Sequence, residues 1–215
     1  MAEIARFSLL TFSAIFFIVD PFAVVPVFIA MTEHDDAAKR AAMARRACLV
    51  ATGVLLFFAL TGTLIFKIFG VTLAAFKIAG GILLLLTALD MLQHKPSTTR
   101  ATPDEIQEGA QKDDIAIVPL AMPLLSGPGA IATVTMLTSE STALWQLAPI
   151  VAAILATTGL SYLLLRGATY VERVLGRSGQ AILGRVMGLL LAAIAVEFML
   201  SGLRESFPAL VRAGG

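Results

Sequence analysis

Six long apolar runs are the feature that most constrains this chain. They cover residues 7–31, 47–66, 71–92, 115–137, 144–165 and 186–203. Each run approaches the length of about 20 residues that a helix needs to cross a bilayer core. Of all residues, 58% are hydrophobic and only 14% are charged, which excludes an ordinary soluble domain. Because short segments join most of the runs, we expect an all-α membrane protein, a bundle of six transmembrane helices without a soluble catalytic domain.

The 16 Lys and Arg residues are distributed unevenly around these runs. Eleven fall on the side of the segments that follow the first, third and fifth runs, and five fall on the other side. The positive-inside rule places the richer side in the cytoplasm. Both termini are therefore predicted on the outer, periplasmic side of the inner membrane. The net charge of +1 gives no reason to expect a nucleic acid as partner.

The polar, Pro-containing segment 94–114 divides the chain into residues 1–93 and 115–215. Its composition, "HKPSTTRATPDEIQEGAQKDD", is typical of a flexible linker, here on the cytoplasmic side. Each flanking part contains three apolar runs. Two parts with an odd number of spans must be inverted relative to each other if they share a fold.

Self-similarity between the two parts favours such a repeat. One ungapped shift of 107 positions, from 21 to 128, aligns "DPFAVVPVFIAMT" with "GPGAIATVTMLTS". The same shift aligns Gly81 with Gly188 and Asp90 with Glu197. The sequence therefore predicts two inverted three-helix repeats.

The first and fourth runs are each interrupted near their middle. Asp20 followed by Pro21 is typical of a helix start, and Gly127 followed by Pro128 repeats it with a neutral cap. Both points lie about 18–20 Å into their runs at 1.5 Å per residue, close to the bilayer centre. We therefore expect helices 1 and 4 to be broken at mid-membrane and their breaks to meet. The non-helical backbone of such a break is tolerated in a membrane where it is buried in protein or lines a cavity.

Three stretches resemble signatures of the MarC family of six-span inner-membrane proteins, which includes small neutral amino acid transporters. They are "DPFAVVPVF", "AGGILLLLTALDML" and "PLAMPLLSGPGAIATV". The chain departs from the expected pattern at Ala23 and Val24, where Gly and Asn are common, and at Glu197, where a glutamine is expected. The resemblance implies secondary transport of small amino acids such as glycine, alanine or serine.

The residues themselves predict how a zwitterion is held. Free N–H groups of Gly129, Ala130 and Ile131, at a half-helix start, suit a carboxylate. Asp20, or carbonyls freed by nearby prolines, suits the ammonium. Rocking of the two repeats about this point would give alternating access. The predicted substrate-binding residues are Asp20, Pro21, Phe22, Ala23, Pro119, Pro123, Ser126, Gly127, Pro128, Gly129, Ala130 and Ile131.

Three carboxylates are candidates for a coupling ion, H⁺ or Na⁺: Asp20, Asp90 and Glu197. Asp20, Asp90 and the prolines also have a structural interpretation. Asp20 can simply cap its half-helix, Asp90 can reach headgroup water at the cytoplasmic end of its helix, and the prolines can simply kink long helices.

The sequence gives less support to other functional classes. One Cys, two His near membrane edges and the absence of HExxH and GxSxG motifs argue against an enzyme, a metal site or a cofactor. A channel, or a membrane scaffold or stress-response protein without transport, remains an alternative. The sequence leaves the oligomeric state open.

Two smaller features complete the expectations. Thr32, three residues before Asp35, predicts the start of a charged helical lead-in over residues 32–47. Four glycines are predicted to permit close packing of helices. They are Gly80, Gly81, Gly184 and Gly188.

Overall fold

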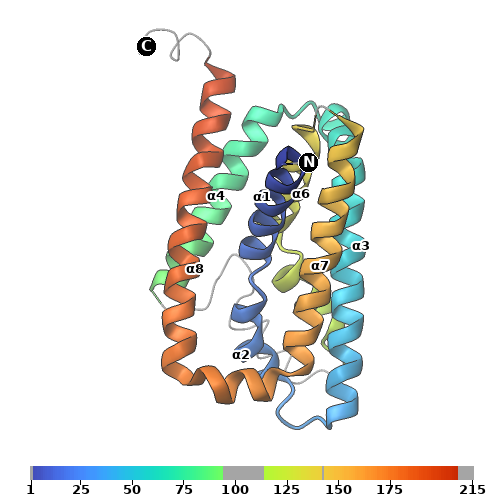
Figure 1. Ribbon diagram of the computed structural model, residues 1–215, viewed down its shortest axis with the longest axis vertical. Helices are drawn as coiled ribbons and strands as arrows, with labels where there is room; N and C mark the ends of the chain where they lie inside the picture. Colours follow the sequence, from blue (N-terminus) through green and yellow to red (C-terminus); the bar gives the residue numbers. More distant parts are fainter. Residues whose placement is uncertain (1, 94–113, 142, 208–215) are drawn as a thin grey trace.

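A computed structural model describes residues 2–93, 114–141 and 143–207, and all regular structure in these ranges is helical. The elements in chain order are α1 (Ala2–Val19), α2 (Pro21–Met31), α3 (Ala37–Phe69), α4 (Leu73–Leu92), η1 (Ala116–Leu125), α6 (Pro128–Ser139), η2 (Leu144–Gln146), α7 (Leu147–Arg166) and α8 (Ala168–Ser206). Figure 1 shows an upright bundle in which α1 begins and α8 finishes at the same end, called here the terminal end. The predicted linker, residues 94–114, lies outside the described residues except for Asp114.

Five helical stretches are long and apolar enough to cross a membrane, or six if η1 and α6 together form one span. These two helices are bent by 56° relative to each other. The prediction of an all-α membrane protein is therefore confirmed for the described residues. The inverted repeat and the mid-membrane position of the breaks stay predictions.

The start of α3 differs from the expected one. Asp36 caps this helix, since its side chain accepts a hydrogen bond from the Lys39 N–H over 2.7 Å. Thr32 instead follows the end of α2, where its hydroxyl donates to the Phe28 carbonyl over 2.7 Å. The prediction that this helix starts at Thr32 was wrong because Asp36 takes the capping role, and aspartate is a strong N-cap residue.

Helix α8 is much longer than the apolar run that predicted it. It begins at Ala168 rather than at residue 186, and a kink at Gly176, whose φ of 58° is left-handed, divides it. Figure 1 shows the first part lying across the end of the bundle opposite the termini before α8 turns upward. The charged segment that precedes the sixth apolar run is therefore helical from Ala168 onward.

Helices α4 and α8 pack closely through small residues. A Cβ atom built on Gly81 would lie 2.7 Å from the Ala195 carbonyl oxygen of α8. A Cβ built on Gly188 would lie 3.1 Å from the Ala88 carbonyl oxygen of α4. Such approach is how helices associate where lipid removes the hydrophobic driving force. The packing role predicted for Gly184 was wrong, because nothing lies within 4 Å of a Cβ there.

The remaining contacts join the two parts of the chain throughout. Helix α1 packs on α7 and η1 packs on α3, while α4 packs on α6 and α2 packs on α8. A hydroxyl pair also joins α3 to α7, since Thr52 Oγ1 donates to Thr158 Oγ1 over 2.8 Å. The two parts therefore form one interleaved core.

Candidate functional site

The first interruption lies at Asp20, between α1 and α2. Its φ of 47° and ψ of 67° are left-handed, a conformation that Asp tolerates better than most residues. Pro21 lacks an N–H and cannot continue the hydrogen-bond ladder of α1, but it fits the first position of α2. The Asp20 side chain accepts from the Ala23 N–H over 3.3 Å and is only 1% exposed. Asp20 therefore caps α2 from within the core.

The second interruption begins with the irregular segment η1. Val118 and Met122 leave the helical region for extended backbone, with ψ of 121° and 122°. Each precedes a proline, which disfavours the helical conformation of the residue before it. At the end of η1 the Ser126 N–H and hydroxyl both donate to the Ala121 carbonyl, over 2.9 and 2.8 Å. This buried serine therefore satisfies a carbonyl of the interrupted segment.

Gly127 separates η1 from α6 and offers no side chain to cap the new helix. A Cβ at this position would lie 2.5 Å from the Pro123 carbonyl oxygen, so the turn requires glycine. The first backbone bond of α6 runs from the Ile131 N–H to the Gly127 carbonyl over 3.0 Å. The expectation that the Ile131 N–H is free was therefore wrong. The N–H groups of Gly129 and Ala130 precede this bond and lie at the positive end of α6.

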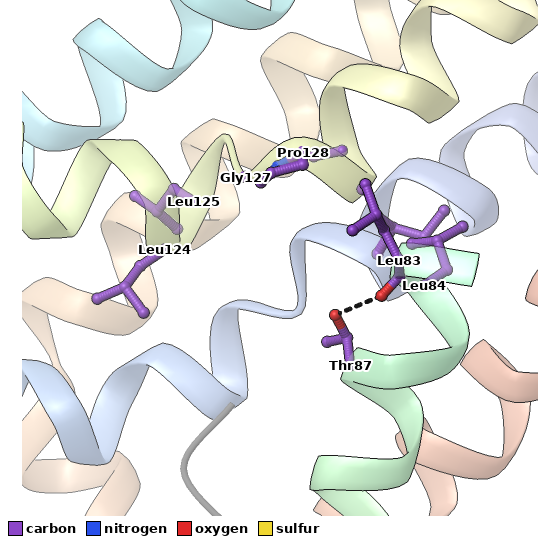
Figure 2. Close-up of a pocket in the computed structure, with 10 residues that line it drawn as sticks. Leu83, Leu84, Thr87, Leu124, Leu125, Gly127 and Pro128 are labelled. Carbon is purple, nitrogen blue, oxygen red and sulfur yellow. Dashed lines mark hydrogen bonds between the residues drawn. The ribbon is translucent and has the colours of Figure 1, made fainter. Parts of the chain in front are cut away.

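A small cavity of about 20 Å³ lies where the end of α1, the middle of α4, the end of η1 and the start of α6 meet. Figure 2 shows Gly127 and Pro128 on one side and Leu83, Leu84 and Thr87 on the other. The lining residues are Ile18, Leu83, Leu84, Thr87, Leu124, Leu125, Gly127, Pro128, Gly129 and Ala130. This volume is close to the space that a single water molecule needs.

The cavity is where the two interruptions approach each other. A Cβ placed on Gly129 would lie 2.6 Å from Leu84 Cδ2 and 3.8 Å from Ile18 Cγ2. Ile18 is two residues before Asp20, so the end of α1 lies against the start of α6. Side chains from both parts of the chain therefore enclose one space.

The predicted binding residues divide into two groups. Gly127, Pro128, Gly129 and Ala130 line the cavity. The others do not line it: Asp20, Pro21, Pro119 and Ser126 are buried, and Phe22, Ala23, Pro123 and Ile131 are half-buried.

The cavity wall from α4 was missed by the sequence reasoning. Leu83 and Leu84 looked like ordinary lipid-facing or core positions in a run of leucines. Thr87 was the available signal, since it is a lone hydroxyl in "AGGILLLLTALDML". Its Oγ1 donates to the Leu83 carbonyl over 3.0 Å, and the residue is buried.

The other two coupling candidates do not line the cavity. The Glu197 side chain is 67% exposed and lies 3.7 Å from the Arg204 guanidinium. Asp90 is half-buried near the end of α4. Within the described residues, no group of three or more His, Cys, Asp or Glu could hold a metal ion.

Several helices long and apolar enough to cross a membrane define the class, a multi-pass integral membrane protein. A family model described as the MarC family integral membrane protein matches residues 5–207, and the chain belongs to this family. UPF0056 membrane protein MJ1677 of Methanocaldococcus jannaschii is 43% identical over 93% of this chain and 97% of its own length.

Bacterial relatives are similar over comparable lengths. YvbG of Bacillus subtilis is 34% identical over 93% of this chain and 95% of its own. YhcE of Escherichia coli is 34% identical over 93% of both chains. The names of these relatives state a membrane protein and no substrate. No solved structure shows a significant match to this chain.

Proposed function

We propose that this protein is a secondary transporter of small neutral amino acids, of the glycine, alanine and serine type. The observation that carries the proposal is the uncapped start of α6, which lies at a small cavity beside the Asp20 interruption. Helix starts attract anions through their unpaired N–H groups and the helix dipole. A buried carboxylate within a membrane-spanning segment is costly and favours a functional role.

In this proposal the two ends of the zwitterion bind to opposite interruptions. The substrate carboxylate accepts from the Gly129 and Ala130 N–H groups. The substrate ammonium faces Asp20, which lies just beyond Ile18 of the cavity wall. Leu84 and the start of α6 leave room for only a small side chain.

The size of the cavity is consistent with a carrier in a closed state. The cavity of about 20 Å³ is close to the space that one water molecule needs, so we expect the surrounding helices to move apart when an amino acid binds. Alternating access provides such movement, because one half rocks against the other around a fixed site.

An inverted repeat, with helices 1 and 4 broken at mid-membrane, is part of the proposal. Reciprocal contacts support it: Gly81 packs on Ala195, and Gly188 packs on Ala88. The shift of 107 positions that turns 81 into 188 also turns 88 into 195, so each contact is the counterpart of the other. Self-complementary contacts of this kind are expected across a two-fold axis.

The same correspondence extends to whole helices. With α1 equivalent to η1 and α3 to α7, the packing of α1 on α7 is the counterpart of the packing of η1 on α3. The packing of α4 on α6 is likewise the counterpart of α2 on α8. For orientation, we propose the inner membrane with the terminal end facing the periplasm, because Lys and Arg are concentrated toward the other side.

Uptake of radiolabelled glycine and alanine into liposomes that contain the purified protein tests this function. Saturable uptake, accelerated by a proton or a sodium gradient, is expected, and the effective gradient identifies the coupling ion. Asp20→Asn preserves the left-handed backbone and should abolish uptake. Gly53→Ala is a matched control, because nothing lies within 4 Å of a Cβ at this position.

The alternatives predict different results. Flux that does not saturate would indicate a channel. No flux under any gradient, from correctly inserted protein, would contradict transport of these solutes and favour a scaffold.

A further inference from the structure

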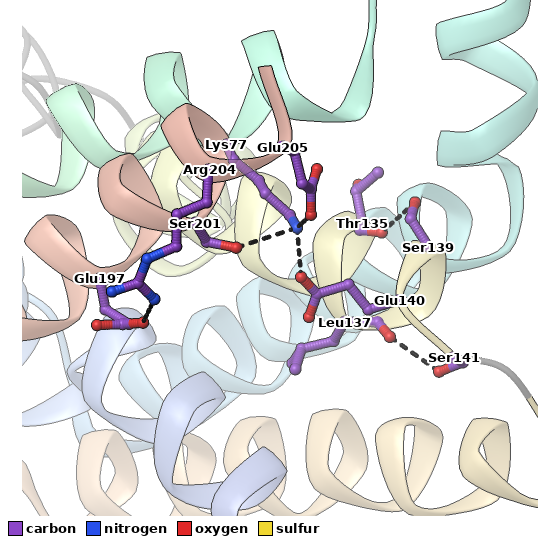
Figure 3. A network of polar contacts seen from close by, with 10 residues as sticks. All are labelled: Lys77, Thr135, Leu137, Ser139, Glu140, Ser141, Glu197, Ser201, Arg204 and Glu205. Atoms are coloured by element: carbon purple, nitrogen blue, oxygen red, sulfur yellow. Dashed lines mark hydrogen bonds and ion pairs between the residues drawn. The ribbon is translucent and has the colours of Figure 1, made fainter. Parts of the chain in front are cut away.

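A buried lysine near the terminal end joins three helices. Lys77 of α4 is 1% exposed, and its ammonium forms ion pairs with Glu140 over 2.5 Å and with Glu205 of α8. It also donates to Ser201 Oγ over 3.3 Å. Figure 3 shows these side chains converging on the Lys77 Nζ atom. Burying an ammonium is unfavourable unless such partners compensate for lost water.

The Lys77 partners among the described residues all belong to the other part of the chain. Lys77 lies in the first three-helix segment, whereas Glu140, Ser201 and Glu205 lie in the second. Helix α8 approaches closely here, since a Cβ on Gly202 would lie 2.6 Å from the Ala74 carbonyl oxygen. The cluster therefore fastens the two parts together.

The cluster lies between the cavity and the terminal end. Helix α6 begins at the cavity with Pro128 and is followed at its far end by Glu140. On α4, Lys77 is about 10 Å nearer the terminal end than Leu84 of the cavity wall, at 1.5 Å per residue. A solute that moves between the cavity and the terminal end must therefore pass this level.

The electrostatics make Lys77 the counter-charge of this region. Glu140 directly follows α6, and Glu205 lies in the last turn of α8. Both carboxylates are thus at the negative ends of helices, where an additional negative charge is unfavourable. Without Lys77 these two carboxylates would repel each other.

We propose that Lys77, Glu140 and Glu205 form a lock between the two parts of the chain that closes the route from the cavity to the terminal end. This inference rests on the proposed alternating access. The two carboxylate side chains are each 43% exposed, so water reaches them as soon as the helices separate. The lock is therefore poised to open without leaving a buried unpaired carboxylate.

The opposite end of the bundle supplies a matched control. Arg46 of α3 pairs with Asp114 over 2.7 Å, again between the two parts of the chain. These side chains are 65% and 45% exposed, and exposed ion pairs contribute little to stability. Arg46→Met should therefore leave the route from the cavity to the terminal end closed.

Cysteine labelling tests the lock without requiring transport. Thr87→Cys, in a Cys48→Ala background, places a thiol in the cavity wall, and a membrane-impermeant maleimide is added from the side of the termini. Lys77→Met should accelerate this labelling at least about tenfold, since a loss of even about 1.4 kcal/mol from the closed state multiplies the open population by ten. The exchange Lys77→Glu with Glu140→Lys should restore slow labelling.

Native Cys48, which is buried in α3, reports general loosening when it is the only cysteine. Its labelling should stay slow in Lys77→Met. Unchanged Thr87→Cys labelling, or equal acceleration at Cys48, would overturn the lock. Faster Thr87→Cys labelling in a protein that transports no amino acid would support the lock and contradict the proposed function. Normal uptake with unchanged Thr87→Cys labelling would support the proposed function and contradict the lock.

Discussion

Gly129 and Leu84 touch across the cavity, so the effects of substituting them should be strongly coupled. A Cβ on Gly129 would lie 2.6 Å from Leu84 Cδ2. This is roughly 1 Å inside the favourable carbon–carbon separation of about 3.5–4.0 Å. Gly129→Ala must therefore displace the Leu84 side chain, at a cost of about 1–3 kcal/mol in the free energy of unfolding. Leu84→Ala leaves a void and costs about 2–5 kcal/mol.

The double variant should be more stable than the sum of the two effects predicts. The new methyl group on residue 129 occupies space that Leu84 vacates. This should recover about 0.5–3 kcal/mol in the free energy of unfolding. The assay is unfolding of wild type, both single variants and the double variant in one detergent. Leu49→Ala, on an exposed position of α3, serves as the uncoupled partner for Gly129→Ala. Additivity of Gly129→Ala and Leu84→Ala within about 0.3–0.5 kcal/mol would refute the contact argument.

Two further predictions concern backbone approaches. Gly81→Ala should lower the melting temperature more than Gly188→Ala. A Cβ at Gly81 would lie 2.7 Å from a backbone oxygen, whereas the nearest atoms to a Cβ at Gly188 are 3.1 Å away. Equal melting temperatures of the two variants would contradict the packing described. Gly127→Ala should destabilise by about 1–3 kcal/mol because the Pro123 carbonyl cannot move freely. Gly53→Ala should be neutral or slightly stabilising, since alanine favours helix and the position is open. A stable Gly127→Ala protein would show that this turn does not need glycine.

Local chemistry explains what the sequence predicted well. The helix starts after Asp20 and Gly127 follow from cap and proline preferences, which act within a few residues. The apolar runs likewise predicted most of the spans, because hydropathy depends on composition alone. The early part of α8 was missed for the same reason. Its charged residues keep it out of the apolar runs, although Arg and Glu are good helix formers.

Contacts between distant parts of the chain could not be predicted in this way. Leu84 and Thr87 join the cavity wall only because α4 packs against α6. Lys77 and Glu205 are 128 residues apart in sequence, so no local pattern indicates their ion pair. The sequence predicted four of the cavity-lining residues because they belong to an interruption that is itself local.

Binding of alanine, propionate and ethylamine to the purified protein tests the central claim most directly. Propionate lacks the ammonium of alanine and ethylamine lacks its carboxylate, and both are small enough to enter wherever alanine does. Only alanine should bind saturably, and Asp20→Asn should weaken it by at least about tenfold, as expected for the loss of a charged hydrogen bond of about 1.5–3 kcal/mol. Asp36→Asn, at the exposed cap of α3, should leave the affinity unchanged. Equal binding of the three compounds, or full affinity in Asp20→Asn, would contradict a site that holds both ends of a zwitterion.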